Sequence, residues 1–107
     1  MKTTVKIAPK TEYTEFIDRD LCRIKYIPTS IFLSVIKEVD WLYSKIVSVS
    51  NLDSLDVHKN LGDDCVEKDA IMLIFKYKRK ERKIFHRAIV ALLTREDISQ
   101  NYCFKII

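Results

Sequence analysis

The side chains best suited to chemistry in this 107-residue chain are gathered in one short basic stretch. The basic residues of that stretch are Lys76, Lys78, Arg79, Lys80, Arg82, Lys83 and Arg87. Glu81 is the one acid among them, so seven bases and one acid give the segment a net charge of +6. Lysine and arginine bind phosphate and carboxylate oxygens, and Tyr77 and Phe85 are near enough in sequence to offer rings for base stacking. The pattern predicts a binding site for an acidic partner, either nucleic acid or an acidic protein surface.

This binding hypothesis depends on the way residues 76–87 fold. Residues 69–78 and 83–94 are predicted strands joined by a turn at 79–82, and such a two-stranded ribbon fits a nucleic-acid groove. Two alternatives stay open. The lysines could simply keep the turn soluble and protect a sheet edge. They could also face the stretch 53–69 of the same chain or of a neighbouring chain, and the six acids and two lysines of that stretch give it a net charge of −4. The binding hypothesis would fail if residues 76–87 lay inside a helix or if these basic residues were scattered around the molecule.

Patterns for catalysis or metal binding are weak. The cysteines and histidines are Cys22, Cys65, Cys103, His58 and His86, and no two have the spacing of metal ligands. Asp63, Asp64 and Glu67 could hold a divalent cation, although such a group is more often a solvated loop. Asp69 followed by Glu81-Arg82-Lys83 imitates the spacing of metal-dependent nucleases, but Glu81 lies in the predicted turn. His86 on the predicted strand is typical of a packed or boundary residue. We therefore predict no catalytic residue, metal or cofactor.

Length and composition indicate one globular domain over residues 1–107. Hydrophobic residues make up 48% of the chain and charged residues 32%. The longest apolar runs have six residues, far short of the roughly 20 of a membrane span, and the N-terminal residues lack a signal-peptide core. An odd number of widely spaced cysteines argues against a disulfide framework. We expect a cytoplasmic protein with no membrane segment, whose composition would suit an AT-rich genome such as that of many phages and viruses.

The periodicity of apolar residues predicts an α+β fold: a small, mostly antiparallel sheet of about five strands with one long helix and one short helix. Alternation predicts strands at 3–8, 21–27 and 102–107, in addition to the two arms of the hairpin. Three- and four-residue steps predict a helical turn or two within 11–17 and a long helix from Thr29 or Ser30 to Ile46. A short helix is expected at 52–61, with Gly62 as its C-terminal cap.

Two of the predicted strands pose a packing problem. Residues 70–75 and 88–93 are apolar at every position, which is typical of strands covered on both faces. The long helix can cover one face of the sheet, and little of the chain remains to cover the other. Either the N-terminal segment folds over that face or another chain does, so self-association is a prediction of the sequence.

These features favour a non-enzymatic interaction module, a small regulator or inhibitor such as a phage modulator, an immunity protein or an antitoxin. The alternative is a toxin-like protein. The expected order of one strand, two helices and three antiparallel strands over 21–107 is similar to that of the RelE/ParE-like toxins, some of which cleave ribosome-bound mRNA. No segment of the chain matches their motifs. The resemblance implies a role in RNA cleavage or binding for a set of basic and aromatic residues, namely His86, Arg87, Arg79, Arg82 and Tyr77.

Overall fold

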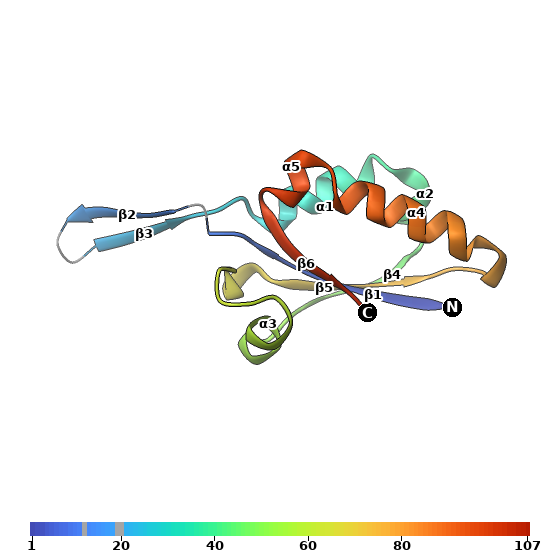
Figure 1. Cartoon of the computed structure of the whole chain (residues 1–107), viewed down its shortest axis with the longest axis horizontal. Helices are drawn as coiled ribbons and strands as arrows, with labels where there is room; N and C mark the ends of the chain where they lie inside the picture. The colour runs from blue at the N-terminus through green and yellow to red at the C-terminus, as the bar shows by residue number, and fades with distance from the viewer. Residues whose placement is uncertain (12, 19–20) are drawn as a thin grey trace.

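The computed structural model places four antiparallel strands in one sheet, in the order β4-β5-β1-β6 (Figure 1). The structure describes residues 1–11, 13–18 and 21–107, and it describes side chains outside residues 12–25. The four strands of the sheet are β1 (Lys2–Pro9), β4 (Ile46–Asn51), β5 (Ile71–Lys76) and β6 (Tyr102–Ile106). A second antiparallel pair, β2 (Tyr13–Asp18) and β3 (Leu21–Lys25), extends away from this sheet. The predicted α+β class is confirmed.

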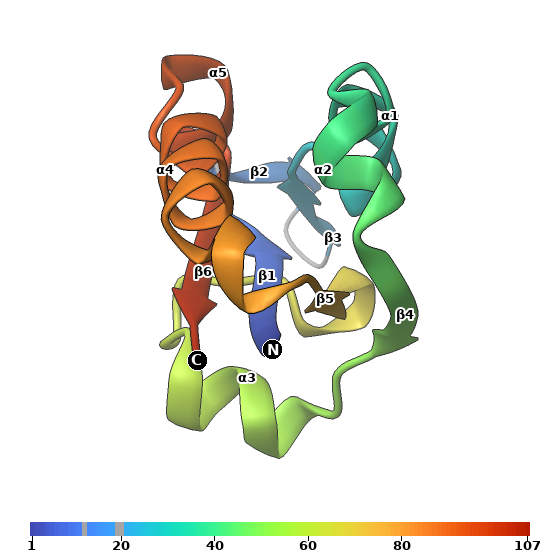
Figure 2. The ribbon, with the colours of Figure 1, turned by 90° about the vertical axis from the view of Figure 1, so that its right-hand side faces the viewer.

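Four helices cover one face of the sheet (Figure 2). They are α1 (Thr29–Lys37), α2 (Asp40–Ser44), α4 (Arg82–Leu93) and α5 (Glu96–Ser99). Alternate residues of a strand point to the same face, so Val5 and Ile7 of β1 turn inward together and are fully buried. They join Leu73 and Phe75 of β5 and the helix residue Phe32 in the main core.

The opposite face is covered at one end by α3 (Ser54–Asn60), as Figures 1 and 2 both show. Its buried residue Val57 packs in a smaller cluster with Ala8 and Ala70 of the sheet region. Asp53 caps the helix, since its carboxylate accepts a hydrogen bond from the Asp56 backbone N–H at 2.8 Å. Gly62 follows the helix with φ +94°, a left-handed conformation that glycine adopts without strain. The predicted short helix and its glycine are confirmed.

The C-terminal half of the predicted hairpin is a helix, so the basic β-hairpin is wrong. Strand β5 forms as expected, but residues 79–81 make a 3₁₀ turn that leads directly into α4. Phe85, Ile89 and Leu93 lie four residues apart and are fully buried, whereas Val90 between them is exposed. That four-residue spacing is the period of a helix packed on one side. This helical period could not be recognised in the sequence, because residues 88–93 are all apolar and a short run without polar residues shows no period.

The predicted long helix at 29–46 divides into three elements. α1 ends at Lys37, α2 spans only five residues, and Ile46–Asn51 forms the edge strand β4. Serines alternate with the β-branched residues of that strand, which is the pattern of a half-exposed strand rather than a helix. The helical turns expected within 11–17 are also wrong, because β2 occupies 13–18. The turn expected at 95–101 contains the short helix α5.

These corrections change the packing argument for self-association. Residues 88–93 belong to a helix and need no second cover, and the N-terminal segment is a central strand of the sheet rather than a lid over it. Met72 and Ile74 of β5 turn to the second face and are half-buried there. The apolar strands therefore give no reason by themselves for a second chain. Within the described residues, none of the helices is long and apolar enough to cross a membrane.

Candidate functional site at the basic end

The seven predicted basic residues lie together, although the element that carries them is not a hairpin. We call them the basic end: Lys76, Lys78, Arg79, Lys80, Arg82, Lys83 and Arg87. All seven are exposed. They lie where β5 leaves the sheet, in the 3₁₀ turn, and in the first two turns of α4, at the end of the molecule drawn on the right of Figure 1. The charge is therefore concentrated at one end of the body.

The single acid of this segment, Glu81, forms hydrogen bonds that stabilise the fold. The Glu81 carboxylate accepts a hydrogen bond from Lys45 Nζ at 2.8 Å and another from the Lys78 backbone N–H at 2.9 Å. The bond from Lys45 is the largest of the influences that lower the pKa of Glu81 below its ordinary value, and the bond from the Lys78 backbone comes next. Among the residues whose side chains are described, none of the seven basic residues forms an ion pair. Their charge is left uncompensated within that part of the chain.

The position of these cations on α4 is electrostatically unfavourable. A helix N-terminus carries partial positive charge and prefers acidic residues. The first turn of α4 has none and begins instead with Arg82 and Lys83. One turn further on, His86 and Arg87 share the same side of the helix, and these four residues line an open groove. An unfavourable local arrangement such as cations at a helix N-terminus is found more often at functional sites than elsewhere.

The aromatic residues proposed for base stacking are buried. Tyr77 is 9% exposed and Phe85 is fully covered. Their rings stack on each other with centroids 4.3 Å apart, and the Tyr77 hydroxyl hydrogen-bonds Thr3 Oγ1 at 2.7 Å. Both rings belong to the core that fixes the end of β5 against the start of α4. Their assignment as binding residues for bases is therefore wrong.

The acidic stretch 53–69 does not face the basic end. Asp56 pairs with Lys6 at 3.4 Å, and the Asp69 carboxylate accepts a hydrogen bond from the Thr29 backbone N–H at 2.9 Å. His58 lies between Asp63, at 3.0 Å from its Nδ1, and Glu67 at its Nε2. The hydrogen bond that the Asp63 carboxylate accepts from His58, and the negative charge of Glu67, raise the pKa of His58. Within one chain, the alternative in which the two charged stretches neutralise each other is wrong for the described side chains.

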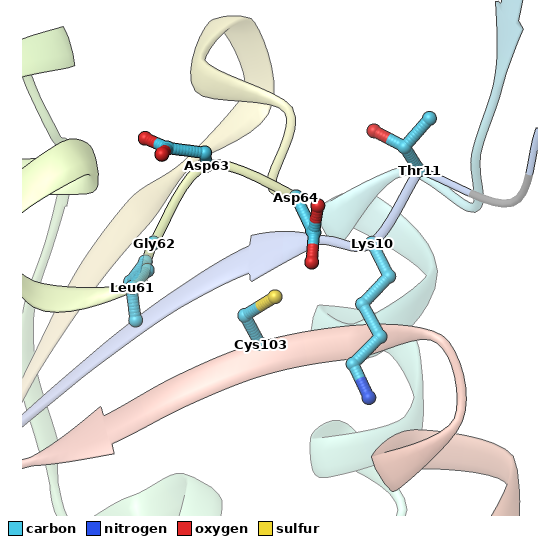
Figure 3. Close-up of a pocket in the computed structure, with 7 residues that line it drawn as sticks. All are labelled: Lys10, Thr11, Leu61, Gly62, Asp63, Asp64 and Cys103. Atoms are coloured by element: carbon cyan, nitrogen blue, oxygen red, sulfur yellow. The ribbon is translucent and has the colours of Figure 1, made fainter. Parts of the chain in front are cut away.

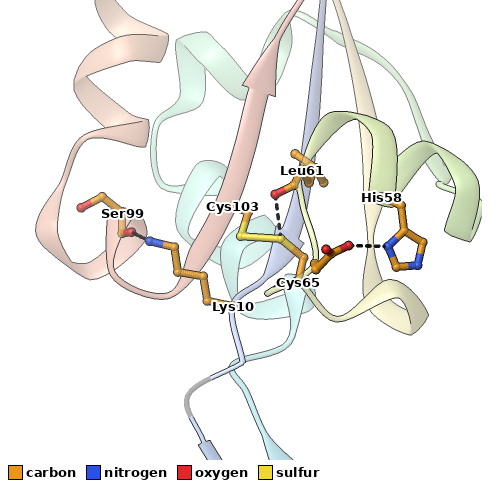
Figure 4. The surroundings of a disulfide bond; sticks show 7 residues. Lys10, His58, Leu61, Cys65, Ser99 and Cys103 are labelled. Carbon is orange, nitrogen blue, oxygen red and sulfur yellow. Dashed lines mark hydrogen bonds and ion pairs between the residues drawn. A yellow bond between two sulfur atoms is a disulfide. The ribbon is translucent and has the colours of Figure 1, made fainter.

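Two of the three cysteines form a disulfide, which corrects the expectation of unpaired cysteines. Cys65 follows α3 and Cys103 lies in β6, with their Cα atoms 6.5 Å apart (Figure 4). The bond ties the covering layer of α3 to an edge of the sheet. The side chain of Cys22 lies outside those described. The cytoplasmic location stays a prediction.

A polar pocket opens beside this disulfide (Figure 3). Its polar side chains include Asp63, Asp64 and Lys10, and Lys10 Nζ donates to the Ser99 carbonyl oxygen at 2.8 Å. In the described part of the chain, no group of three or more histidine, cysteine, aspartate or glutamate residues is placed to hold a metal ion. Asp69 and Glu81, the acids of the nuclease-like spacing, take part in separate helix contacts.

The element order differs from that expected for a RelE/ParE-like toxin. A strand, β4, lies between the N-terminal helices and α3, and the second of the three C-terminal strands is the helix α4. No protein-family model matches the chain, and comparison with curated proteins and with solved structures gave no match either. Sequence reasoning found the basic residues, but it grouped His86 with them only through the toxin resemblance and otherwise predicted a packed or boundary residue, whereas His86 is exposed. The helical spacing of Arg82, Lys83, His86 and Arg87 was the signal that could have placed it in the groove.

Proposed function

We propose that this protein is a non-enzymatic binding module that contacts the phosphate backbone of nucleic acid through its basic end. One observation carries the proposal: seven exposed cations gather at a helix N-terminus, and none has an ion-pair partner among the described side chains. Such a cluster repels itself when the protein is free. A polyanion would relieve that repulsion and release its own counterions on binding.

The composition of the basic end favours nucleic acid over an acidic protein. Four of its seven residues are lysines, which are depleted at the centres of protein interfaces. Aromatic anchors that dominate such interfaces are buried here, since Tyr77 and Phe85 belong to the core. Phosphate contacts need only charge and reach, and exposed lysines and arginines supply both.

The same geometry supports binding without base stacking. With the nearby rings buried, the exposed groups of the groove are the side chains of Arg82, Lys83, His86 and Arg87. These residues occupy two turns on one side of α4, where they can follow a phosphate backbone. We therefore expect a duplex to bind at least as well as a single strand, and affinity to vary little with sequence.

The test is the salt dependence of binding, measured by fluorescence anisotropy with a labelled DNA duplex and an RNA duplex of mixed sequence. We expect the logarithm of affinity to fall linearly with the logarithm of salt concentration. Reversing Arg79, Lys80 and Arg82 to glutamate removes three contacts. That triple variant should bind at least about a hundredfold more weakly, and the salt slope should shrink by roughly three.

The matched control reverses three exposed lysines elsewhere, Lys59, Lys68 and Lys105, to glutamate. Its change in net charge is the same, so a general charge effect would weaken both triple variants equally. We expect the control to retain most of the affinity. Equal losses in the two variants, or no binding of either duplex by the wild type at low salt, would contradict the proposal, and an acidic protein surface would then be the partner to test.

A further inference from the structure

The free edge of β4 carries exposed apolar side chains. Val47 is 57% exposed and Val49 is 49% exposed, in a strand that is otherwise built from Ile46, serines and Asn51. Tyr43, near the end of α2, and Leu55, at the start of α3, are also exposed and flank this strand in sequence. We call Val47, Val49, Tyr43 and Leu55 the apolar edge. It lies on the opposite side of the sheet from β6 (Figure 2).

The backbone of β4 offers unpaired hydrogen-bonding groups on the same edge. In the described part of the sheet, β4 pairs with β5 alone. The Leu52 backbone N–H donates to the Ala70 carbonyl at 3.0 Å, which continues the ladder between these strands. Every second residue of an antiparallel strand bonds to the same neighbour, so Ser50 bonds to β5 and the peptide groups of Val49 and Asn51 turn outward.

Strand β4 lacks the charged residues and prolines that commonly protect an edge strand, and its one protecting feature is an irregularity at its start. Edge strands are commonly protected by lysine, proline or an inward-pointing charge. Although 32% of the chain is charged, none of the six residues of β4 is. The other edge strand, β6, carries the exposed Lys105. A register shift between Ile46 and Ser48 leaves the rest of β4 regular from Ser48 to Asn51.

We propose that the apolar edge binds a second copy of this chain, with the two β4 strands pairing antiparallel in one continuous sheet. A two-fold axis places the residues of a strand opposite residues of the same strand in the second copy, so a strand that carries no charge pairs with itself without like-charge repulsion. The uncharged β4 meets this condition. The two-fold axis lies perpendicular to the sheet, which keeps the helices of both copies on one face and brings their Val49 side chains together.

The basic end lies at the end of β5 and the start of α4, next to the start of β4, where the Lys76 backbone N–H donates to the Lys45 carbonyl oxygen at 2.8 Å. The proposed pairing is centred further along the strand, on Val49. In the pair, the second copy runs in the opposite direction, so the two basic ends point to opposite ends of the continuous sheet. The two proposals rest on different residues, so each can fail without the other.

Sedimentation velocity over a range of concentrations tests the pairing. We expect the wild type to approach twice its 12.6 kDa chain mass as concentration rises. Val49→Lys places a charge where the two strands meet, and it should weaken the dimer at least about tenfold because like charges then face each other across the two-fold axis. Val47→Lys, at a second exposed position, should have the same direction of effect. Each change is at a half-exposed side chain, so circular dichroism should show an unchanged fold.

Ile84→Lys is the matched control, because Ile84 is a comparably exposed apolar residue, at 60%, on α4. This variant should dimerise as the wild type does. Hydrogen exchange gives a second readout: the amides of Val49 and Asn51 should become protected as concentration rises, while that of Lys105 should not change. A wild type that stays a single chain at its highest soluble concentration would overturn the proposal. So would equal weakening by Ile84→Lys and Val49→Lys.

Discussion

The acidic stretch 53–69 and the basic end are both rich in charge, but among the described side chains only those of the acidic stretch use their charge to stabilise the fold. Asp53 caps α3, Asp69 accepts a hydrogen bond at the start of α1, and Asp56 pairs with Lys6. In the basic stretch, Glu81 is the one charged side chain with such a contact among the side chains that the structure describes. A charge that holds a helix end is not free for a ligand. The comparison therefore points to the basic end, and away from the acidic stretch, as the place where a partner binds.

The prediction with the largest expected effect concerns the disulfide that joins the acidic stretch to the sheet. Cys65 and Cys103 are 38 residues apart in sequence, and closing a loop of that length stabilises a fold by about 4 kcal/mol. Reduction should lower the free energy of unfolding by about that amount, measured by urea denaturation with and without a reductant. Cys103→Ser should be equally destabilised and insensitive to reductant. A wild type whose urea midpoint ignores reductant would show that the bond makes no such contribution.

A smaller effect is expected from the acid at the start of α1. Asp69→Ala leaves the backbone N–H of Thr29, a residue that is only 2% exposed, without its acceptor. The loss should cost about 1–2 kcal/mol of unfolding free energy, the usual value of a lost helix cap. Asp69→Asn should recover part of it, because an amide oxygen still accepts. The comparison variant is Asp64→Ala, at an exposed acid, which should stay within about 0.5 kcal/mol of the wild type.

The strands with clear alternation were predictable from sequence. In β1 and β6 polar and apolar residues alternate, and both strands form where the pattern places them. The short helix α3 was also predictable, because Asp53 and Gly62 mark its two ends. Local chemistry decided these elements, and tertiary packing did not override it.

Elsewhere the pattern was ambiguous, and tertiary packing decided. Residues 88–93 are apolar throughout and fit a strand or a helix, and only the burial of Phe85, Ile89 and Leu93 on one side shows which formed. β4 continues a helical spacing of apolar residues from α1, and its pairing with β5 could not be read from one sequence. The same ambiguity affected the site. Its basic residues were found from composition, but the burial of Tyr77 and the role of His86 depended on the helix.

The prediction with the smallest expected effect tests most directly whether a residue of the basic end stabilises the fold. Arg82→Glu places a negative charge in the first turn of α4 and removes one of seven mutually repelling cations. It should raise the unfolding free energy by roughly 0.3–1 kcal/mol at low salt, because a helix N-terminus favours acidic residues. The gain should shrink as salt is added, since exposed charges are screened. Thermal denaturation of wild type, Arg82→Gln and Arg82→Glu should rank stability in that rising order. A loss of stability in Arg82→Glu would instead mean that Arg82 holds the fold, as Asp69 does, and the distinction between the two charged stretches would fail at that residue.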